Sequence, residues 1–457
     1  MVRVRFAPSP TGIPHIGNTR TALFNYLFAM HNSGKFILRI EDTDKARLVP
    51  GSLAKILEIL KIVGIDWDEG PYIQSERLAI YKKYALELVK KGAAYRCYCS
   101  PERLKTLRGH GYDRHCLKLS TSKVESLKKP FVIRLKVPQT GETGWQDLIQ
   151  GKIVFKNQLL DDQVLLKSDG FPTYHLAVVV DDHLMKISHI LRGSEWISST
   201  PKHILLYQAF GWPQPQFGHF PVILGPDKAK LSKRHGAKSI LDYQAEGYLP
   251  QALTTFMAYL GWSYQDNSQL LSMEELIKLF DIKKIHQTNA IFDLQKLNYF
   301  NAKLIRQTPM KSLLQLIKPY LKLKISEDRL AKIIPLIQER LVKLGEVNDL
   351  IEYFVIQPKT NTKVLLLESN LSVAGTKKYL QQVSQAVDSV SDWSVTGLEE
   401  KLHDLQTKLG LKPRPAFMTI RLAVTGRPAT PPLFDVLYIL GKDEVVSRLT
   451  YVQKTLG

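Results

Sequence analysis

A strand, a proline-rich turn and a helix follow one another directly at the start of this chain. Val2, Val4 and Phe6 alternate with polar residues, as in a strand, and Thr19 to Met30 carries apolar residues at helical spacing. Between them, residues 5–18 (RFAPSPTGIPHIGN) hold three prolines and two glycines. In an open parallel sheet such a turn lies at the carboxyl end of a strand, beside the free N–H groups of a helix start, where phosphates bind. The segment therefore predicts an α/β fold with a phosphate-binding turn.

A second segment, residues 225–236 (GPDKAKLSKRHG), holds Lys230 and Lys233 between two glycines. Read alone, it is a basic surface loop, just as His15 read alone is an ordinary turn residue. A loop with two cations can also bring them to the β- and γ-phosphates of a nucleotide. Charge builds on pyrophosphate as it leaves, so cations placed there stabilise the transition state.

Acidic residues follow the next predicted strand. Residues 35–40 (KFILRI) read as a strand that ends in Glu41-Asp42-Thr43-Asp44. Solvated loop charges or helix caps are the ordinary explanation of such a run. A substrate with an α-ammonium group would need an anion of this kind nearby.

The composition indicates a globular protein whose partner is a polyanion. A chain of 457 residues with 44% hydrophobic and 23% charged side chains is large enough for roughly two to four domains. The net charge of +20 favours nucleic acid as the partner, through phosphate contacts and counterion release, although charge alone does not separate tRNA from DNA or an anionic membrane surface. No leader and no bilayer-length apolar run is present, so we expect a cytoplasmic protein without a membrane partner.

Periodicity changes along the chain. Helices are expected at 52–63, at 74–91, from Ser326 with a kink at Pro335, and at 398–409. Between residues 93 and 184, short strand-like runs at 131–137, 153–155 and 163–166 alternate with glycine and proline breaks, which indicates a mixed α+β insertion. Beyond Ser239 the strand-like runs fade and helices dominate.

The motifs, taken in order, resemble those of class I aminoacyl-tRNA synthetases in the form found in the bacterial-type glutamyl-tRNA synthetases. Residues 5–18 resemble the His-x-Gly-His element, with Asn18 at the variable fourth position, and residues 230–234 (KLSKR) resemble the Lys-Met-Ser-Lys-Ser motif. The resemblance covers essentially the whole chain and is densest from Arg5 to Glu76 and from Gln163 to Gly247. Further matching strings are residues 39–44, 64–71, 168–183, 190–196, 292–297, 417–426 and 433–442.

This resemblance implies the domain order. A Rossmann-like catalytic domain is expected in two halves, residues 1–92 and 185–240, interrupted at 93–184 by an inserted domain that binds the tRNA acceptor end. A stem-contact domain at 241–310 and an all-α anticodon-binding region at 311–457 would follow. The expected protein is a monomer.

The resemblance also implies the reaction and its residues. ATP with Mg²⁺ would activate L-glutamate as glutamyl-adenylate, which is then transferred to the 3′-terminal adenosine of tRNA-Glu, so the expected activity is that of an aminoacyl-tRNA ligase. The catalytic groups would be His15, Lys230 and Lys233. The ATP-binding residues would be Pro8, Thr11, Gly12, His15, Gly17, Glu195, Trp196, Leu231 and Lys233. The glutamate-binding residues would be Arg5, Ala7, Ser9, Glu41, Tyr174 and Arg192.

All three cysteines fall within one short segment, Cys97, Cys99 and Cys116, which argues against a disulfide framework. A structural zinc ion takes four ligands in a tetrahedron. Some members of the family bind zinc here with a tyrosine as an occasional fourth ligand, which would be Tyr112, with His115 and His110 as the alternatives. The other explanation is three reduced thiols kept after the metal was lost.

Each of three alternative functions predicts a sequence feature that can be compared with this chain. Shortened relatives that modify a tRNA base lack the C-terminal helical half, which this chain has. Glutaminyl-tRNA synthetases carry a β-barrel anticodon-binding part, and alternating strands are absent here after about Asn301. A non-catalytic tRNA-binding descendant would be favoured by loss of His15, Lys230 or Lys233, and all three are present. Whether tRNA-Gln is charged as well as tRNA-Glu stays open.

Overall fold

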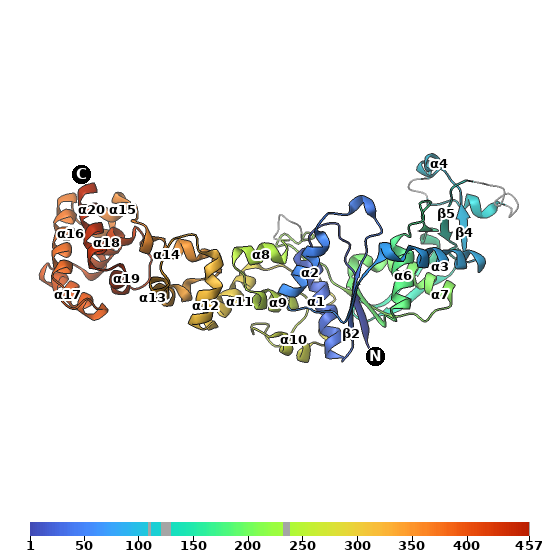
Figure 1. The fold of residues 1–457 in the computed structure, drawn as a ribbon, viewed down its shortest axis with the longest axis horizontal. Helices are drawn as coiled ribbons and strands as arrows, with labels where there is room; N and C mark the ends of the chain where they lie inside the picture. Colours follow the sequence, from blue (N-terminus) through green and yellow to red (C-terminus); the bar gives the residue numbers. More distant parts are fainter. Residues whose placement is uncertain (108–110, 120–128, 232–237, 457) are drawn as a thin grey trace. The chain divides into compact units, whose positions relative to one another are not determined.

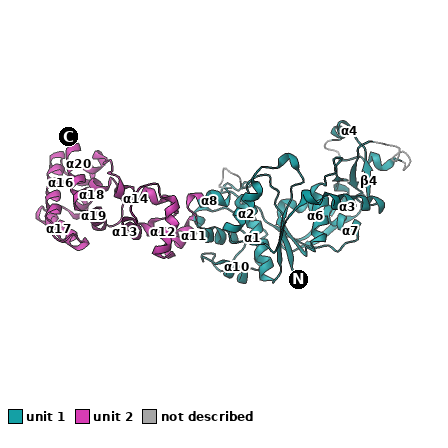
Figure 2. Ribbon diagram, viewed as in Figure 1, with its two compact units in different colours: residues 1–244, 249–297 teal, residues 245–248, 298–457 magenta. Residues whose placement is uncertain are grey.

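The structure, a computed structural model, describes residues 1–107, 111–119, 129–231 and 238–456. The chain divides into two compact units (Figures 1 and 2). The first comprises residues 1–244 and 249–297, and the second residues 245–248 and 298–457. The division falls inside the segment 241–310 that we expected to be a separate domain, and the four boundaries drawn from the sequence remain predictions.

The strands of the described residues lie in the first unit and form several small sheets. They are β1 (Arg3–Phe6), β2 (Lys35–Ile40), β3 (Glu69–Ile73), β4 (Ala94–Cys97), β5 (Val132–Leu135), β6 (Glu142–Asp147), β7 (Gly151–Lys156), β8 (Val164–Leu166), β9 (His189–Gly193), β10 (Gln216–Phe220), β11 (Ile223–Leu224) and β12 (Ala290–Ile291). Strand β2 is buried at five successive positions, the pattern of a parallel strand covered on both faces. It confirms the strand predicted at 35–40.

Two of these sheets lie next to each other at the start of β1 and β9. One sheet has the order β1-β2-β3 and the other β7-β6-β10-β9. Ser188, just before β9, donates its N–H to the carbonyl oxygen of Arg3 (2.9 Å), and the Arg3 N–H donates to Ser188 Oγ (2.7 Å). The spatial order therefore runs outward from β1 in one direction and from β9 in the other. The carboxyl ends of these two strands form a topological switch point, the place where open α/β sheets bind ligands.

Helices pack around these strands (Figure 1). Those before residue 280 are α1 (Ile16–His31), α2 (Ser52–Ile62), α3 (Leu78–Lys90), α4 (Pro101–Thr106), α6 (Tyr174–Leu184), α7 (Thr200–Phe210), α8 (Ile240–Glu246), α9 (Pro250–Ala258) and α10 (Met273–Leu279). Helices α3, α6 and α7 share one apolar core with β5 and β10, which contains Leu88, Ile133 and Phe217. The helices predicted at 19–30, 52–63 and 74–91 are present, the last of them beginning with a 3-10 turn at Gln74–Arg77.

The segment predicted as an insertion contributes to two sheets. Strands β4, β5 and β8 form an antiparallel sheet of their own. The hairpin β6–β7 instead joins the sheet of β9 and β10, because Asp147 of β6 pairs in parallel with Phe217 of β10. Strand β6 was not predicted, since its sequence ETGWQD is polar and holds a glycine, yet every second residue is buried. Asp147, which belongs to the insertion segment, therefore lies in the same sheet as Arg192 of β9.

The described part of the second unit is helical, as predicted. Its helices, with α11 beginning in the first unit, are α11 (Leu294–Gln307), α12 (Met310–Ile317), α13 (Glu327–Ile337), α14 (Val347–Val355), α15 (Thr362–Ser369), α16 (Val373–Asp388), α17 (Val395–Lys408), α18 (Pro413–Thr425), α19 (Leu433–Leu440) and α20 (Lys442–Thr455). Ser326 caps α13 by accepting from the Arg329 N–H (3.3 Å), which confirms the predicted cap. Pro335 lies inside α13, which ends two residues later.

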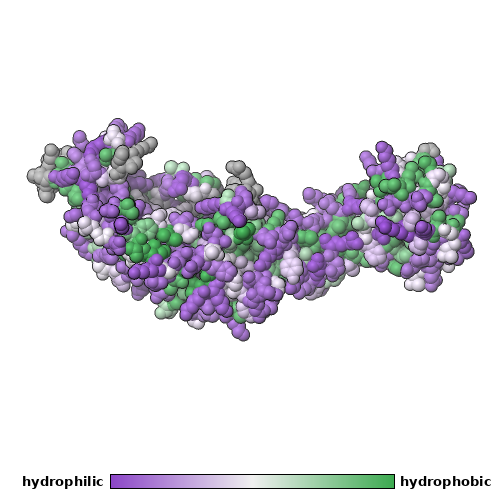
Figure 3. Space-filling model, turned by 180° about the vertical axis from the view of Figure 1, so that it is seen from behind, coloured by the Kyte–Doolittle hydropathy of each residue, from purple (hydrophilic) through white to green (hydrophobic). Residues whose placement is uncertain are grey.

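Hydrophilic residues cover most of the face shown in Figure 3, and apolar residues gather in separate patches. Among the described residues, large exposed apolar side chains such as Leu159, Tyr299 and Leu367 come from different parts of the chain, as is normal for protein surfaces. None of the helices in the described ranges is both long and apolar enough to cross a lipid bilayer.

Candidate active site

A cavity of about 820 Å³ opens at the switch point between β1 and β9. Its walls come from the ends of β1, β2 and β9 and from the loops that follow them. The lining residues that the sequence had singled out are Arg5, Ala7, Pro8, Ser9, Thr11, Gly12, His15, Glu41, Tyr174, Arg192, Glu195 and Trp196. Segments far apart along the chain are thus brought to one site.

His15 is the N-cap residue of α1. Its Nδ1 accepts a hydrogen bond from the Gly17 N–H (3.0 Å), which leaves Nε2 as the nitrogen that carries the proton. Desolvation, together with the Lys230 ammonium, lowers the pKa of His15, so the ring stays neutral near pH 7. A Cβ at Gly17 would lie 2.8 Å from His15 Cε1, so glycine is needed for the ring to fold over the helix start.

The chain just beyond the second predicted phosphate-binding segment contacts the first segment at His15 and Ile16. The Ile16 N–H donates to the carbonyl oxygen of Lys238 (3.1 Å), and His15 pairs with Ser239 in an isolated bridge. At the other end of the second segment, Lys230 is exposed and bridges to Leu224 of β11, while Leu231 is buried. Lys233 lies outside the described residues.

Arginine and carboxylate side chains alternate at the base of the cavity. The Arg5 Nε donates to Asp182 Oδ1 (3.1 Å), and an Arg39 terminal nitrogen donates to the same oxygen (2.7 Å). Arg39 also donates to Glu41 Oε1 (3.2 Å). Burial raises the pKa of Asp182, but Arg39 and Arg5 outweigh it, and its pKa lies below the usual value. For Glu41 burial prevails over the same arginines and the pKa is raised.

Arg192 also lines the cavity and has a hydrogen-bond partner at each nitrogen. Its Nε donates to His219 Nε2 (3.2 Å), and its terminal nitrogens donate to the Tyr174 hydroxyl (3.1 Å) and to Thr200 Oγ1 (2.8 Å). The side chain is almost fully buried. Burial raises the pKa of Tyr174, so the phenol stays neutral and can accept from the guanidinium.

An aromatic surface lies at the mouth of the cavity. The rings of Tyr174 and Trp196 have centroids 4.5 Å apart and are tilted by 35°, and Trp196 is 37% exposed. Glu195 lies beside it and is also exposed. A flat, half-exposed indole suits stacking with a nucleobase.

Sequence reasoning did not single out Arg39, Asp181 and Asp182 as functional residues. Asp181 accepts from the Tyr81 hydroxyl (2.7 Å), from Gln74 Nε2 (3.0 Å) and from Arg77 Nε (2.9 Å), so it anchors the inner wall of the cavity. The sequence pattern that could have indicated them is a charged residue inside or next to an apolar run, as in residues 36–40 (FILRI) and 177–182 (AVVVDD). Such residues are buried only when they are paired.

A histidine pair beside Arg192, of which His203 is buried and His175 half-buried, predicts that stability falls in mild acid. Burial lowers the pKa of His175 to about 4 and places that of His203 well below 6.5, and the two rings are hydrogen-bonded at 3.0 Å. The unfolded chain then binds more protons, so stability is full above about pH 6.5 and is lost as pH falls towards 4, by on the order of 3 kcal/mol for His175 alone. Urea unfolding at pH 7.5 and 5.0 measures this loss.

The matched variant for that measurement is His175→Gln, which keeps a hydrogen-bonding side chain but cannot titrate. We expect its stability to fall less between the two pH values than that of the natural protein. Equal losses in both proteins would contradict the assignment to His175.

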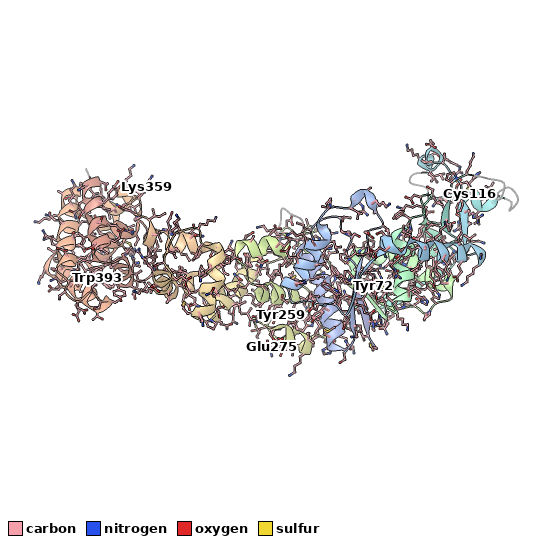
Figure 4. All side chains as sticks on the ribbon, in the orientation of Figure 1. Tyr72, Cys116, Tyr259, Glu275, Lys359 and Trp393 are labelled. Atoms are coloured by element: carbon pink, nitrogen blue, oxygen red, sulfur yellow. The ribbon has the colours of Figure 1, made fainter. Side chains whose placement is uncertain are left out.

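The three cysteines lie together beside β4 and β5, where Figure 4 labels Cys116. Their Sγ atoms all lie within 4.8 Å of one another. The Tyr112 hydroxyl is 3.2 Å from Cys97 Sγ and 3.3 Å from Cys99 Sγ, whereas, within the described ranges, no ring nitrogen of His115 belongs to the group of candidate ligands. His110 lies outside the described residues. Because sulfurs around tetrahedral zinc are about 3.8 Å apart, the spacing of the three Sγ atoms is compatible with a zinc ion.

Comparisons with known proteins agree over the whole chain. Residues 1–299 match the family described as "tRNA synthetases class I (E and Q), catalytic domain", and residues 312–453 match "Anticodon binding domain". The chain is 44% identical to the glutamate–tRNA ligase of Dehalococcoides mccartyi strain CBDB1, over 98% of this chain and 96% of the relative. It is 43% identical to that of Thermodesulfovibrio yellowstonii, over 99% of both.

A solved structure shows the same fold. It is a glutamate tRNA ligase from Elizabethkingia meningosepticum in complex with its amino acid, which matches all of both chains with a TM-score of 0.92 and 36% identity. The expected fold class, a class I synthetase catalytic domain followed by a helical anticodon-binding region, is thereby confirmed.

Proposed function

The chain belongs to the glutamate–tRNA ligase family of class I tRNA synthetases, and from this membership we propose how its cavity activates glutamate and transfers it to tRNA. The predicted enzyme class, an aminoacyl-tRNA ligase, is confirmed by the same relatives. The family uses ATP with Mg²⁺ as the co-substrate. The roles of individual residues, given below, are our proposal.

The reaction has two steps. A carboxylate oxygen of glutamate attacks the α-phosphorus of ATP, and pyrophosphate leaves with the electrons of the broken P–O bond. A ribose hydroxyl of the terminal adenosine of tRNA-Glu then attacks the acyl carbon, and AMP leaves. The cavity serves both steps by positioning and charge, so no protein nucleophile is required.

The glutamate subsite is the inner part of the cavity, built from Arg5, Ala7, Ser9, Glu41, Tyr174 and Arg192. Two guanidinium groups in one cavity suit a substrate that carries a second carboxylate, because arginine binds carboxylates through parallel hydrogen bonds. Glu41 provides the anion for the α-ammonium group. The presence of both Arg5 and Arg192 in the lining of one cavity is the observation that carries the proposal.

The ATP subsite is the outer part. His15 donates its Nε2–H to a phosphate oxygen beside the start of α1, with Pro8, Thr11, Gly12 and Gly17 shaping the turn. Glu195, Trp196 and Leu231 surround the adenosine. Lys230 and Lys233 neutralise the leaving pyrophosphate as charge develops on it.

Charging of purified tRNA with labelled glutamate tests the proposal. We expect incorporation into tRNA-Glu that requires ATP, and no incorporation of glutamine. Parallel reactions with tRNA-Gln establish whether the enzyme accepts one tRNA or both. Absence of glutamate incorporation into either tRNA would overturn the proposed function.

We further propose that the three cysteines and Tyr112 hold one structural zinc ion, which would fix the loop after β4 to the helical turn at Cys116. Protein purified without a chelator should contain about one zinc per chain, and Cys99→Ser should lose it. Elemental analysis of both proteins measures this.

Tyr112→Phe is the informative comparison for the metal, because it keeps the ring but removes the oxygen ligand. It should retain the three sulfur ligands and bind zinc more weakly than the natural protein. A zinc content near zero in the natural protein would contradict the metal assignment, and unchanged affinity in Tyr112→Phe would remove the tyrosine from the ligand set.

The remaining assignments belong to the same proposal. The enzyme would act in the cytoplasm as a monomer, which sedimentation of the purified chain tests. The acceptor end of tRNA would bind the insertion at 93–184 and the anticodon the helices of 311–457.

A further inference from the structure

Arg192 is backed by a chain of buried side chains from two neighbouring strands. His219 of β10 is paired in register with Arg192 of β9, and Asp147 ends strand β6 on the far side of β10. His219 Nδ1 lies 2.5 Å from Asp147 Oδ2, and His219 Nε2 lies 3.2 Å from Arg192 Nε. The side chains of Asp147 and His219 are completely buried. The chain of contacts therefore runs, without solvent, from the insertion hairpin to the cavity wall.

The chemistry of the three groups fixes where each proton lies. A guanidinium has only donors, so His219 Nε2 must offer its lone pair and the ring proton must reside on Nδ1, facing Asp147. Burial raises the pKa of Asp147, but the hydrogen bond from His219 outweighs it and the pKa is about 2, so the carboxylate is ionised. Burial also lowers the pKa of His219, which keeps the ring neutral. One tautomer is thus imposed on His219.

Asp147 is itself held by the backbone. Its Oδ1 accepts from the N–H groups of Ile149 (3.1 Å), Gln150 (3.0 Å) and His219 (3.1 Å), and its Oδ2 also accepts from Trp145 Nε1 (3.1 Å). Every hydrogen bond of this carboxylate is one that it accepts. Donors at both oxygens therefore hold the plane of the carboxylate relative to His219.

We propose that His219 and Asp147 are positioning residues that hold the Arg192 guanidinium in one orientation and so set the preference of the cavity for a side-chain carboxylate over an amide. This inference rests on the proposed function, in which Arg5 and Arg192 bind the two carboxylates of glutamate, and it assigns the side-chain carboxylate to Arg192. Nε donates to His219, so a substrate carboxylate would have to be bound through the terminal nitrogens, which also donate to Tyr174 and Thr200. A guanidinium free to rotate would present a less defined set of donors and would accept an amide oxygen more readily.

Asp147→Asn tests the inference with almost no change in shape. Placing the amide nitrogen at Oδ1 would set it against three N–H donors, so the nitrogen takes the Oδ2 position, where it opposes one donor, Trp145 Nε1–H, and faces His219 Nδ1. The ring must then carry its proton on Nε2, which opposes the Nε–H of Arg192, a tautomer change of the kind known for catalytic carboxylate–histidine pairs. We expect the KM for glutamate to rise between about fivefold and a hundredfold, the loss for one buried hydrogen bond. Selectivity for glutamate over glutamine should fall with it.

Two variants of His219 sharpen the test. His219→Ala removes the acceptor and should resemble Asp147→Asn, whereas His219→Gln returns a carbonyl oxygen near the position of Nε2 and should recover part of the glutamate KM. The KM for ATP should change by less than about threefold in all three variants, because a positioning role acts on one substrate only.

The matched control is Thr143→Ala on the same hairpin. Thr143 is buried and its hydroxyl donates to Asn157 (2.6 Å), so the variant disturbs β6–β7 without touching His219 or Arg192. It should lower the melting temperature and leave selectivity unchanged. If Asp147→Asn raises the KM values for glutamate and ATP together, or leaves both within twofold, the proposal is overturned.

A direct measurement covers the case in which a variant fails to fold. Nitrogen-15 shifts of His219 in the natural protein should show a protonated Nδ1 and an unprotonated Nε2, and the reverse assignment would overturn the proposal. Failure of the proposed function is separate, since it appears as no glutamate charging by the natural protein. If the inference alone fails, the natural protein charges tRNA with glutamate normally, and the substitutions at residues 147 and 219 leave its selectivity for glutamate over glutamine unchanged.

Discussion

Replacing Arg192 with lysine is expected to lower kcat/KM for glutamate by about a hundredfold or more. A lysine keeps the positive charge but has no planar pair of donors, so it cannot grip a carboxylate through two parallel bonds. It also removes the hydrogen bonds that Arg192 donates to His219 and Thr200 in a buried wall. Breaking a buried, hydrogen-bonded charge pair costs about 2–5 kcal/mol, which corresponds to this loss. Steady-state charging at saturating ATP and tRNA measures it.

Arg3→Lys is the matched control for this prediction. Arg3 lies in β1 outside the cavity lining and forms a two-point pair with Glu69 at 2.8 and 2.9 Å. The same substitution there should change kcat/KM by less than about threefold, because the pair is partly exposed and such pairs contribute about 0–1 kcal/mol. If both variants lose activity equally, the loss reflects the fold and Arg192 does not bind the substrate as proposed.

Local sequence was enough to predict the elements that carry the phosphate-binding turn. The strand at 35–40 is found at those residues, and the helix predicted from Thr19 is present as α1, which begins three residues earlier at Ile16. Both depend on interactions within a few residues, namely apolar runs, breakers and caps. The same holds for α13, whose cap and apolar face were visible in the sequence.

The residues of the inner wall of the site could not be predicted from local sequence patterns. Asp147 lies in a polar strand that pairs with β10 across about 70 residues of chain, and no local periodicity indicates such a pairing. His219 looks like any histidine in an apolar strand until its contacts are known. Arg192 was identified only through resemblance, since a single arginine is usually a surface charge. Residues that act on a substrate directly were therefore easier to find than those that position them.

Replacing His15 with alanine is expected to lower kcat by about a hundredfold, as for loss of one donor to a developing charge. The substitution also removes the cap of α1, which costs about 1 kcal/mol of stability. His15→Asn separates the two effects. Asparagine is a good cap, so it should restore most of the stability, but its short side chain lacks the Nε2–H that we propose donates to the phosphate. Activity should stay low in both variants, as measured by glutamate charging and by thermal unfolding.

Ser326→Ala is the control for the cap alone. Ser326 caps α13 in the second unit by accepting from the Arg329 N–H, so its loss has the same local cost without altering the cavity. We expect a similar fall in stability and kcat within about twofold of the natural protein. Recovery of activity in His15→Asn would mean that His15 serves only to start the helix, and the phosphate would then depend on the backbone N–H groups of α1 and on the lysines of the second segment.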